Sequence, residues 1–276
     1  MTPEELSILV GVAAEAAEVV LRVYEQPFEV DYKAPADPVT EADRAANALI
    51  CDRLSTAFPG VPIVAEESAP ETFSEFRKSQ RVFFVDPVDG TREFVAKNGE
   101  FVVMIGVLEG ERAVASVIHA PTTKTAWVGL VGYGAFELGA DGSRKRLHVT
   151  DTPELSQARI VSSRSHRTER LERALSALGA REIVKQGSAG LKGAHVAAAT
   201  ADAYVAPHHA GQRWDICPTD ALVQAAGGRV TDAYGELIDY RADKLVNDRG
   251  VVLTNGHLHD AIIARLALAR ELSRPM

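Results

Sequence analysis

The sequence contains few cysteines and no long hydrophobic run. Its 276 residues include two cysteines, Cys51 and Cys217, which form neither a Cys-x-x-Cys pair nor a disulfide framework. This usage is typical of a reducing compartment, so we expect a cytoplasmic protein. The longest apolar stretches, such as residues 101–108, are too short to span a bilayer, and residues 1–25 lack the basic start of a signal peptide. We therefore expect no membrane association.

Positive charge is also in deficit. The chain has 30 Lys and Arg residues against 38 Asp and Glu residues, which gives a formal net charge of −8. A negative net charge disfavours binding to nucleic acid or to an anionic membrane surface. An anionic substrate would therefore need local help, either from metal ions or from a few well-placed basic groups.

The pattern of predicted elements changes near residue 150. Before this point two helices, at about 2–24 and 40–58, accompany a loop at 34–38 and strands predicted at 28–33, 61–68, 81–90, 102–110, 111–121, 124–132 and 134–142. The last four strands predict an antiparallel meander. After it, strands and helices alternate through 158–163, 167–178, 181–187, 188–200, 201–207, 214–228, 229–235 and 250–255, followed by a last helix. We therefore expect an α+β half at 1–150 and an α/β half at 151–276.

Carboxylates recur where predicted elements begin or end. Six of them stand at such positions: Asp43, Glu66, Glu67, Asp86, Asp89 and Asp215. If these ends converge, the like charges would repel strongly unless cations lie between them. Hard divalent cations prefer oxygen ligands, and the lack of Cys or His at ligand spacing disfavours zinc.

Each acid also has an ordinary explanation. Asp43 completes a helix-capping pattern with Thr40, and Asp215 is a first-turn acid favoured by the helix dipole. Asp86 precedes a proline and could simply start a turn. Taken singly, these explanations are the better ones. The placement of all the acids at the ends of apolar elements nevertheless favours one common site.

The residues after the strand at 81–90 sharpen this hypothesis. Gly90 would let the backbone approach a ligand closely, and Thr91 would bring a hydroxyl next to the acids. If a helix begins there, its free N–H groups could bind phosphate. Metal-binding carboxylates beside an anion-binding helix start predict hydrolysis of a phosphate ester.

These motifs resemble a known superfamily. Residues 86–91 (DPVDGT), with AEES at 65–68, WD at 214–215 and ADPVTEAD at 36–43, resemble the signature of magnesium-dependent, lithium-sensitive phosphatases. That superfamily includes inositol monophosphatases, fructose-1,6-bisphosphatases and 3′(2′),5′-bisphosphate nucleotidases. The resemblance implies a layered α-β-α-β-α sandwich with the metals between its halves. TREF at 91–94, SSRSH at 162–166 and GSAGLK at 187–192 are similar to the nucleotidase branch.

The resemblance also implies residue roles. It implies binding of two or three Mg²⁺ ions by Glu66, Asp86, the Val88 carbonyl, Asp89 and Asp215. The attacking water would be oriented and deprotonated by Asp43 and Thr91, with Glu67 assisting through a further ion. The phosphate would be held by the N–H groups of Gly90 and Thr91. The rest of the substrate would face Ser163, Arg164, Ser165, His166, Gly187, Ser188 and Lys192.

The resemblance therefore implies a phosphatase that converts adenosine 3′,5′-bisphosphate (PAP) to AMP. The main alternative is a sister enzyme acting on inositol phosphates or histidinol phosphate, with the same metal site. A remoter alternative is a non-catalytic protein that binds a nucleotide or a partner. If they do not bind substrate, Lys192 could be an ordinary solvated lysine and residues 164–166 a polar turn before a helix. The expected partner is a small phosphate ester, and the oligomeric state, a homodimer included, stays open.

Overall fold

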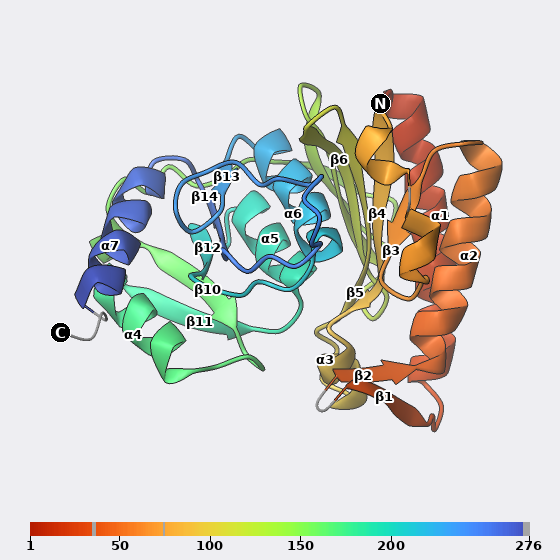
Figure 1. Cartoon of the computed structure of the whole chain (residues 1–276), viewed down its shortest axis with the longest axis horizontal. Helices are drawn as coiled ribbons and strands as arrows, with labels where there is room; N and C mark the ends of the chain where they lie inside the picture. The colour runs from red at the N-terminus through yellow and green to blue at the C-terminus, as the bar shows by residue number, and fades with distance from the viewer. Residues whose placement is uncertain (35–36, 74, 273–276) are drawn as a thin grey trace.

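The computed structural model describes residues 1–34, 37–73 and 75–272. A seven-stranded and a five-stranded β-sheet alternate with layers of helices through the molecule (Figure 1). Helices α1 and α2 form one outer layer, α5 and α6 fill the space between the sheets, and α4 and α7 form the other outer layer. The predicted α-β-α-β-α sandwich is therefore confirmed.

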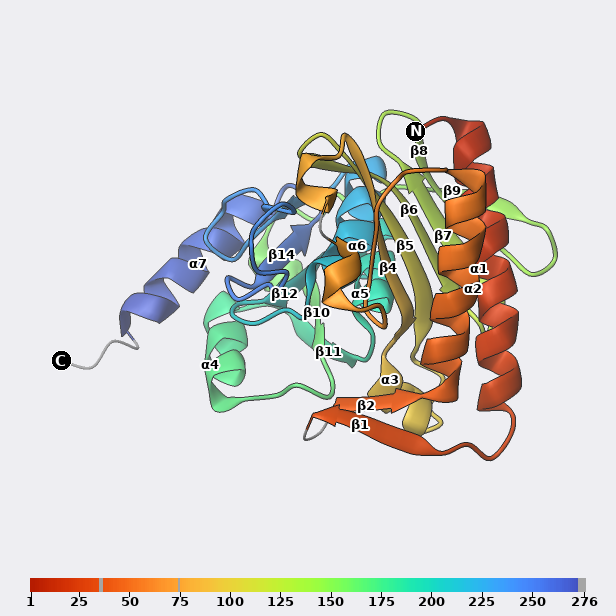
Figure 2. The ribbon, with the colours of Figure 1, turned by 45° about the vertical axis from the view of Figure 1, so that its right-hand side comes forward.

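The outer pair of helices is defined by capping and by an apolar stripe. Helix α1 (Pro3–Tyr24) begins with a capping box between Thr2 and Glu5, as its sequence predicts. Its buried side chains recur at helical spacing, at Leu6, Leu9, Val12, Ala13, Ala16, Ala17 and Val20. Helix α2 (Glu41–Ala57) runs beside it, and both cover the same face of the first sheet (Figure 2).

The first sheet has seven strands in chain order: β3 (Ile63–Ala65), β4 (Arg81–Asp89), β5 (Val102–Glu109), β6 (Arg112–Ala120), β7 (Thr125–Leu130), β8 (Gly134–Leu138) and β9 (Arg144–Leu147). Strands β3 and β4 are parallel, and every later neighbouring pair is antiparallel. The predicted meander is confirmed. Strand β9 was not predicted, because its sequence RKRL is polar and mostly exposed.

A short hairpin lies at one end of this sheet. Strands β1 (Val30–Ala34) and β2 (Asp37–Thr40) pair antiparallel next to α3 (Thr91–Val95) (Figure 2). The prediction of a loop at 34–38 is wrong at both ends, since Ala34 and Asp37–Pro38 belong to paired strands. Residues 35–36 of that loop lie outside the described residues.

The second sheet has the strand order β11-β10-β12-β14-β13. Its strands are β10 (Arg159–Ser163), β11 (Glu182–Gln186), β12 (Ala203–Ala206), β13 (Arg229–Thr231) and β14 (Val251–Thr254). Helices α4 (Glu169–Leu178), α5 (Ala189–Ala197) and α7 (His259–Leu272) alternate with them, as the sequence predicts. Short 3₁₀ turns occupy Pro70–Phe73, Phe76–Lys78 and Leu155–Gln157.

Helix α6 (Arg213–Ala225) connects the second part of the chain to the first sheet. It packs closely over β5, where a Cβ on Gly106 would lie only 2.7 Å from the Pro218 nitrogen. Glycine is therefore required at this point for the helix to approach the strand. The contact fixes the start of α6 close to the end of β4.

No helix in the described parts of the chain is both long and apolar enough to cross a membrane.

Candidate active site

Asp86 and Asp89 reach the same side of the sheet through an irregularity in β4. Side chains three positions apart in a regular strand point to opposite faces. Between Asp86 and Asp89 the pairing with β5 shifts, because Asp86 lies opposite Met104 and Asp89 opposite Val102. The extra residue is a β-bulge, a device that redirects side chains. Both carboxylates are almost fully buried, with exposures of 2% and 8%.

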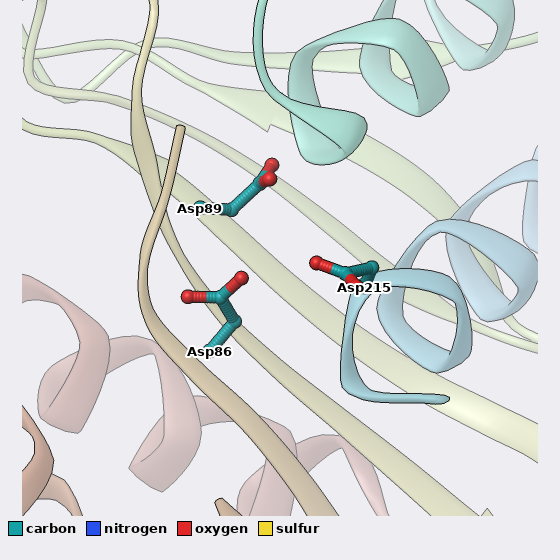
Figure 3. Close-up of side chains that lie close together, drawn as sticks. All are labelled: Asp86, Asp89 and Asp215. Atoms are coloured by element: carbon teal, nitrogen blue, oxygen red, sulfur yellow. The ribbon is translucent and has the colours of Figure 1, made fainter. Parts of the chain in front are cut away.

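Asp215 completes a group of three acids. It is the third residue of α6, and one of its oxygens accepts a hydrogen bond from the Gln212 N–H in a capping box. One carboxylate oxygen from each of Asp86, Asp89 and Asp215 lies within 4.8 Å of the others. The three side chains point toward a common space from β4 and from the start of α6 (Figure 3). Three of the six acids predicted at separate element ends therefore meet.

The electrostatics of this group fit a divalent cation. The pKa of Asp86 lies well above its usual range, because the group is buried and because the negative charges of Glu66, Asp89 and Asp215 lie nearby. Burial and the charges of Asp89 and Glu66 raise the pKa of Asp215 to about 8. Closely spaced carboxylates of this kind form a hard oxygen donor set, which suits a cation such as Mg²⁺.

Glu66 and Glu67 extend the acidic group but already contact a cationic side chain. The Lys33 Nζ on β1 lies 2.8 Å from Glu66 Oε1 and 2.6 Å from Glu67 Oε1. Burial opposes the charged form of Lys33, but Glu66 and Glu67 outweigh it and raise the Lys33 pKa. Burial raises the pKa of Glu66, and Lys33 partly offsets this. The β1–β2 hairpin thus supplies a counter-charge to the site that the sequence did not predict.

Asp43 and Thr91 form a hydrogen-bonded pair. The Thr91 hydroxyl lies 3.1 Å from Asp43 Oδ1 and 3.1 Å from the Val88 carbonyl oxygen, so either oxygen can accept a hydrogen bond from it. The other oxygen of Asp43 accepts hydrogen bonds from the Thr40 N–H and hydroxyl, at 2.8 and 2.6 Å. Asp43 is 1% exposed, and burial raises its pKa despite these bonds. A carboxylate with a raised pKa beside a hydroxyl is chemically suited to accept a proton.

Gly90 allows the sharp turn between β4 and α3. Its φ of 99° is in the left-handed region, and a Cβ there would lie 2.8 Å from the Glu100 carbonyl oxygen. No other residue type fits this turn without strain. Helix α3 then begins directly after Gly90.

Ser188 contacts Asp89 directly, and Lys192 lies behind Ser188. The Ser188 hydroxyl and the Gly190 N–H both donate to Asp89 Oδ2, and Ser188 has the unusual φ of 56°. Lys192 is 4% exposed, and its Nζ donates to the Ser188 carbonyl. The alternative of a solvated lysine is therefore wrong. Burial lowers the Lys192 pKa, which nearby Asp89 and Glu93 oppose.

The segment 163–166 contacts Glu93 and Glu100 of the first part of the chain. Arg164 donates to both oxygens of Glu100, with Nε 2.9 Å from Oε2. Ser165 donates to Glu93, and His166 lies near Ser163 at the surface. These contacts join the two parts of the chain next to the acids.

The sequence did not predict the roles of Glu93 and Glu100 in this network. Glu100 also accepts a hydrogen bond of 2.7 Å from the Gly187 N–H. Glu93 is buried although it follows an exposed-looking Arg92. The available signal for Glu93 was its place in TREF (91–94), the stretch that is similar to the nucleotidase branch.

A family comparison agrees with this geometry. The model of the inositol monophosphatase family matches residues 2–271. The chain belongs to this family. Its members are metal-dependent phosphatases, which are hydrolases, and the acid group lies where two parts of the chain meet.

Individual relatives lie in two branches of the family. The chain is 36% identical over 233 residues to a protein of Escherichia coli named 3′(2′),5′-bisphosphate nucleotidase CysQ, covering 83% of this chain and 90% of that protein. A crystal structure of CysQ from Bacteroides thetaiotaomicron is 27% identical, with a TM-score of 0.78 over 91% of this chain and 97% of that one. The structure of a Thermotoga maritima IMPase is 25% identical, with a TM-score of 0.83 over 98% and 99%.

Proposed function

We propose that this protein is a cytoplasmic, Mg²⁺-dependent phosphatase that hydrolyses the 3′-phosphate of PAP to give AMP and phosphate. The similarity to CysQ proteins named as bisphosphate nucleotidases over most of the chain carries the proposal. The nucleotidase-like motifs at 91–94, 162–166 and 187–192 also support it.

The acidic group would hold the metal. We propose Asp86, Asp89, Asp215, Glu66 and the Val88 carbonyl as the ligands, in a site between the halves 1–150 and 151–276. All offer hard oxygen atoms, and repulsion among the buried carboxylates favours a bound cation. A bound divalent cation would neutralise these acids and lower the pKa of a water molecule at the site.

The neighbouring residues would position the reaction. Asp43 would accept the proton of the attacking water, and the Thr91 hydroxyl, 3.1 Å from Asp43 Oδ1, would orient that water. The N–H groups of Gly90 and Thr91, at the start of α3, would hold the phosphate. Glu67 would adjust the charge of the site opposite Lys33. No nucleophilic serine or cysteine is needed for a direct attack by water.

The remaining predicted residues would bind the rest of the substrate. Ser188 and Gly187 form the turn next to Asp89, and Lys192 lies behind that turn as a buried positive charge. Arg164, with Ser163, Ser165 and His166 beside it, supplies the exposed part of the surface. A bisphosphate is strongly anionic, so these cations would offset the net charge of −8.

Turnover of four substrates side by side tests the proposal. PAP, inositol 1-phosphate, fructose 1,6-bisphosphate and histidinol phosphate would be compared by kcat/KM with Mg²⁺ present. We expect PAP to be preferred and AMP to be the product. Similarity to solved inositol monophosphatases makes inositol 1-phosphate the strongest competitor. A higher kcat/KM for inositol 1-phosphate than for PAP would move the protein to the sister branch.

A further inference from the structure

The guanidinium group of Arg164 is already occupied by a carboxylate. Its Nε and one terminal nitrogen donate to the two oxygens of Glu100, and the same terminal nitrogen also lies 3.0 Å from the Lys185 carbonyl. This two-pronged geometry is the one by which arginine binds either a carboxylate or a phosphate. Glu100 therefore occupies the donors that an anionic substrate would use.

The Glu100–Arg164 pair lies next to the acidic group. Glu100 Oε2 accepts a hydrogen bond from the Gly187 N–H, and the next residue, Ser188, donates to Asp89. The pair is thus one short turn of chain away from the acids. It also links the first part of the chain to the second.

The pair is exposed enough to open. The Arg164 side chain is 44% exposed and the Glu100 side chain 22% exposed. Burial opposes the charge of Glu100, but Arg164 and the Gly187 N–H outweigh it and hold the Glu100 pKa below its usual range, so Glu100 is ionised. Ion pairs with this exposure contribute little to stability, so a doubly charged phosphate can replace the carboxylate.

We propose that Glu100 is a specificity-determining residue that competes with the second phosphate of the substrate for Arg164. The inference rests on the proposed function. The second phosphate of a substrate can bind Arg164 in place of Glu100, whereas a monophosphate leaves the Glu100–Arg164 ion pair intact.

The substitution Glu100→Gln tests this role. Glutamine keeps an oxygen that can accept from the Gly187 N–H, so the turn retains its support while the charge is removed. We expect the KM for PAP to fall about two- to fivefold with kcat unchanged, which is the range of one exposed ion pair. The KM for adenosine 3′-monophosphate should fall less. Arg164→Ala should raise the KM for PAP, and in its presence Glu100→Gln should lose its effect on PAP.

Glu182→Gln is the matched control, because Glu182 forms an exposed ion pair with Arg159 at the opposite end of β10 and β11 from Ser163 and Gln186. It should leave both KM values unchanged. An unchanged or raised KM for PAP in Glu100→Gln, or an equal fall for both substrates, would overturn the inference alone. A wild-type enzyme that does not hydrolyse PAP would instead overturn the proposed function, and this inference with it. Melting temperatures of all variants would show that each is folded.

Discussion

At the scale of single residues, helix capping and the candidate site use the same carboxylates. Asp43 and Asp215 each occupy the third position of a helix, and each accepts a backbone N–H with one oxygen. In Asp43 the second oxygen faces Thr91. The cap fixes the side chain, so the ordinary explanation for these acids and the functional one are compatible. Rigid support of this kind is what a catalytic group requires.

Asp89 provides a test at this scale. Asn at this position keeps a carbonyl acceptor for Ser188 and Gly190 but removes one charge from the acidic group. We expect turnover of Asp89→Asn to fall by more than about 10-fold. Loss of a residue that merely supports a metal ligand typically costs about 10- to 100-fold, and loss of the ligand itself should cost more. Without metal, its melting temperature should be unchanged or higher, because repulsion falls.

Asp202→Asn is the control for this variant, since Asp202 is buried and accepts from the Thr150 hydroxyl and the Arg159 N–H away from the acids. It should retain turnover. Near-normal turnover in Asp89→Asn would remove Asp89 from the proposed ligands.

Asp220 gives a prediction for pH. Burial raises its pKa from 3.8 to about 6, although Tyr240 and Gln224 donate to it. The folded state therefore binds the proton more tightly than the unfolded chain, and this stabilisation is lost as pH rises from about 4 to about 6. The lost contribution is about 3 kcal/mol.

Asp220→Asn should remove this part of the pH dependence. The measurement is the free energy of unfolding in urea at several pH values, taken as wild type minus variant so that other acids cancel. The difference should change by about 2 kcal/mol between pH 4 and 7. Parallel curves for the two proteins would show that Asp220 does not titrate in this range.

At the scale of elements, two features position the acids: the bulge in β4 and the close packing of α6 on β5. The bulge turns Asp86 and Asp89 to one side. The packing brings the start of α6, with Asp215, to the same place. Both features depend on backbone irregularity or on the lack of a side chain.

Gly106→Ala tests the second feature. The new Cβ would lie 2.7 Å from the Pro218 nitrogen and 2.9 Å from Cys217 Sγ, so α6 must shift. We expect a loss of about 1–3 kcal/mol in stability and a higher Mg²⁺ concentration for half-maximal activity. Chemical denaturation and Mg²⁺ titration of the activity would measure the two effects.

Gly11→Ala is the matched control, because Gly11 lies in α1 with no heavy atom near its added Cβ. It should stabilise the protein by about 0.5–1 kcal/mol and leave the Mg²⁺ response unchanged. Equal behaviour of the two variants would mean that the contact between α6 and β5 does not position Asp215.

Local patterns predicted most elements, because capping residues and apolar periodicity are written in adjacent positions. The same patterns identified Asp86, Asp89 and Asp215 as acids at element ends. They could not show the bulge, because its register depends on the pairing with β5. They could not show the burial of Lys192 either, because that burial depends on elements packed against α5 from elsewhere in the chain. The contact of Lys33 with Glu66 joins residues far apart in the chain, and no local signal predicts it.

At the scale of the whole molecule, this acidic protein places three carboxylates, Asp86, Asp89 and Asp215, close together. The acids come from both parts of the chain, and α6 connects the parts. Repulsion in this group weakens the contact between the parts unless a cation is present. Metal binding should therefore stabilise the fold as well as enable hydrolysis.

The most direct measurement is PAP hydrolysis by the chelator-treated protein, followed by titration with Mg²⁺. We expect no activity after exhaustive chelation, saturable recovery with Mg²⁺ and inhibition by Li⁺, as the resemblance to lithium-sensitive phosphatases implies. The melting temperature should rise over the same range of Mg²⁺ concentration. Full activity after exhaustive chelation would contradict a metal-dependent reaction at Asp86, Asp89 and Asp215.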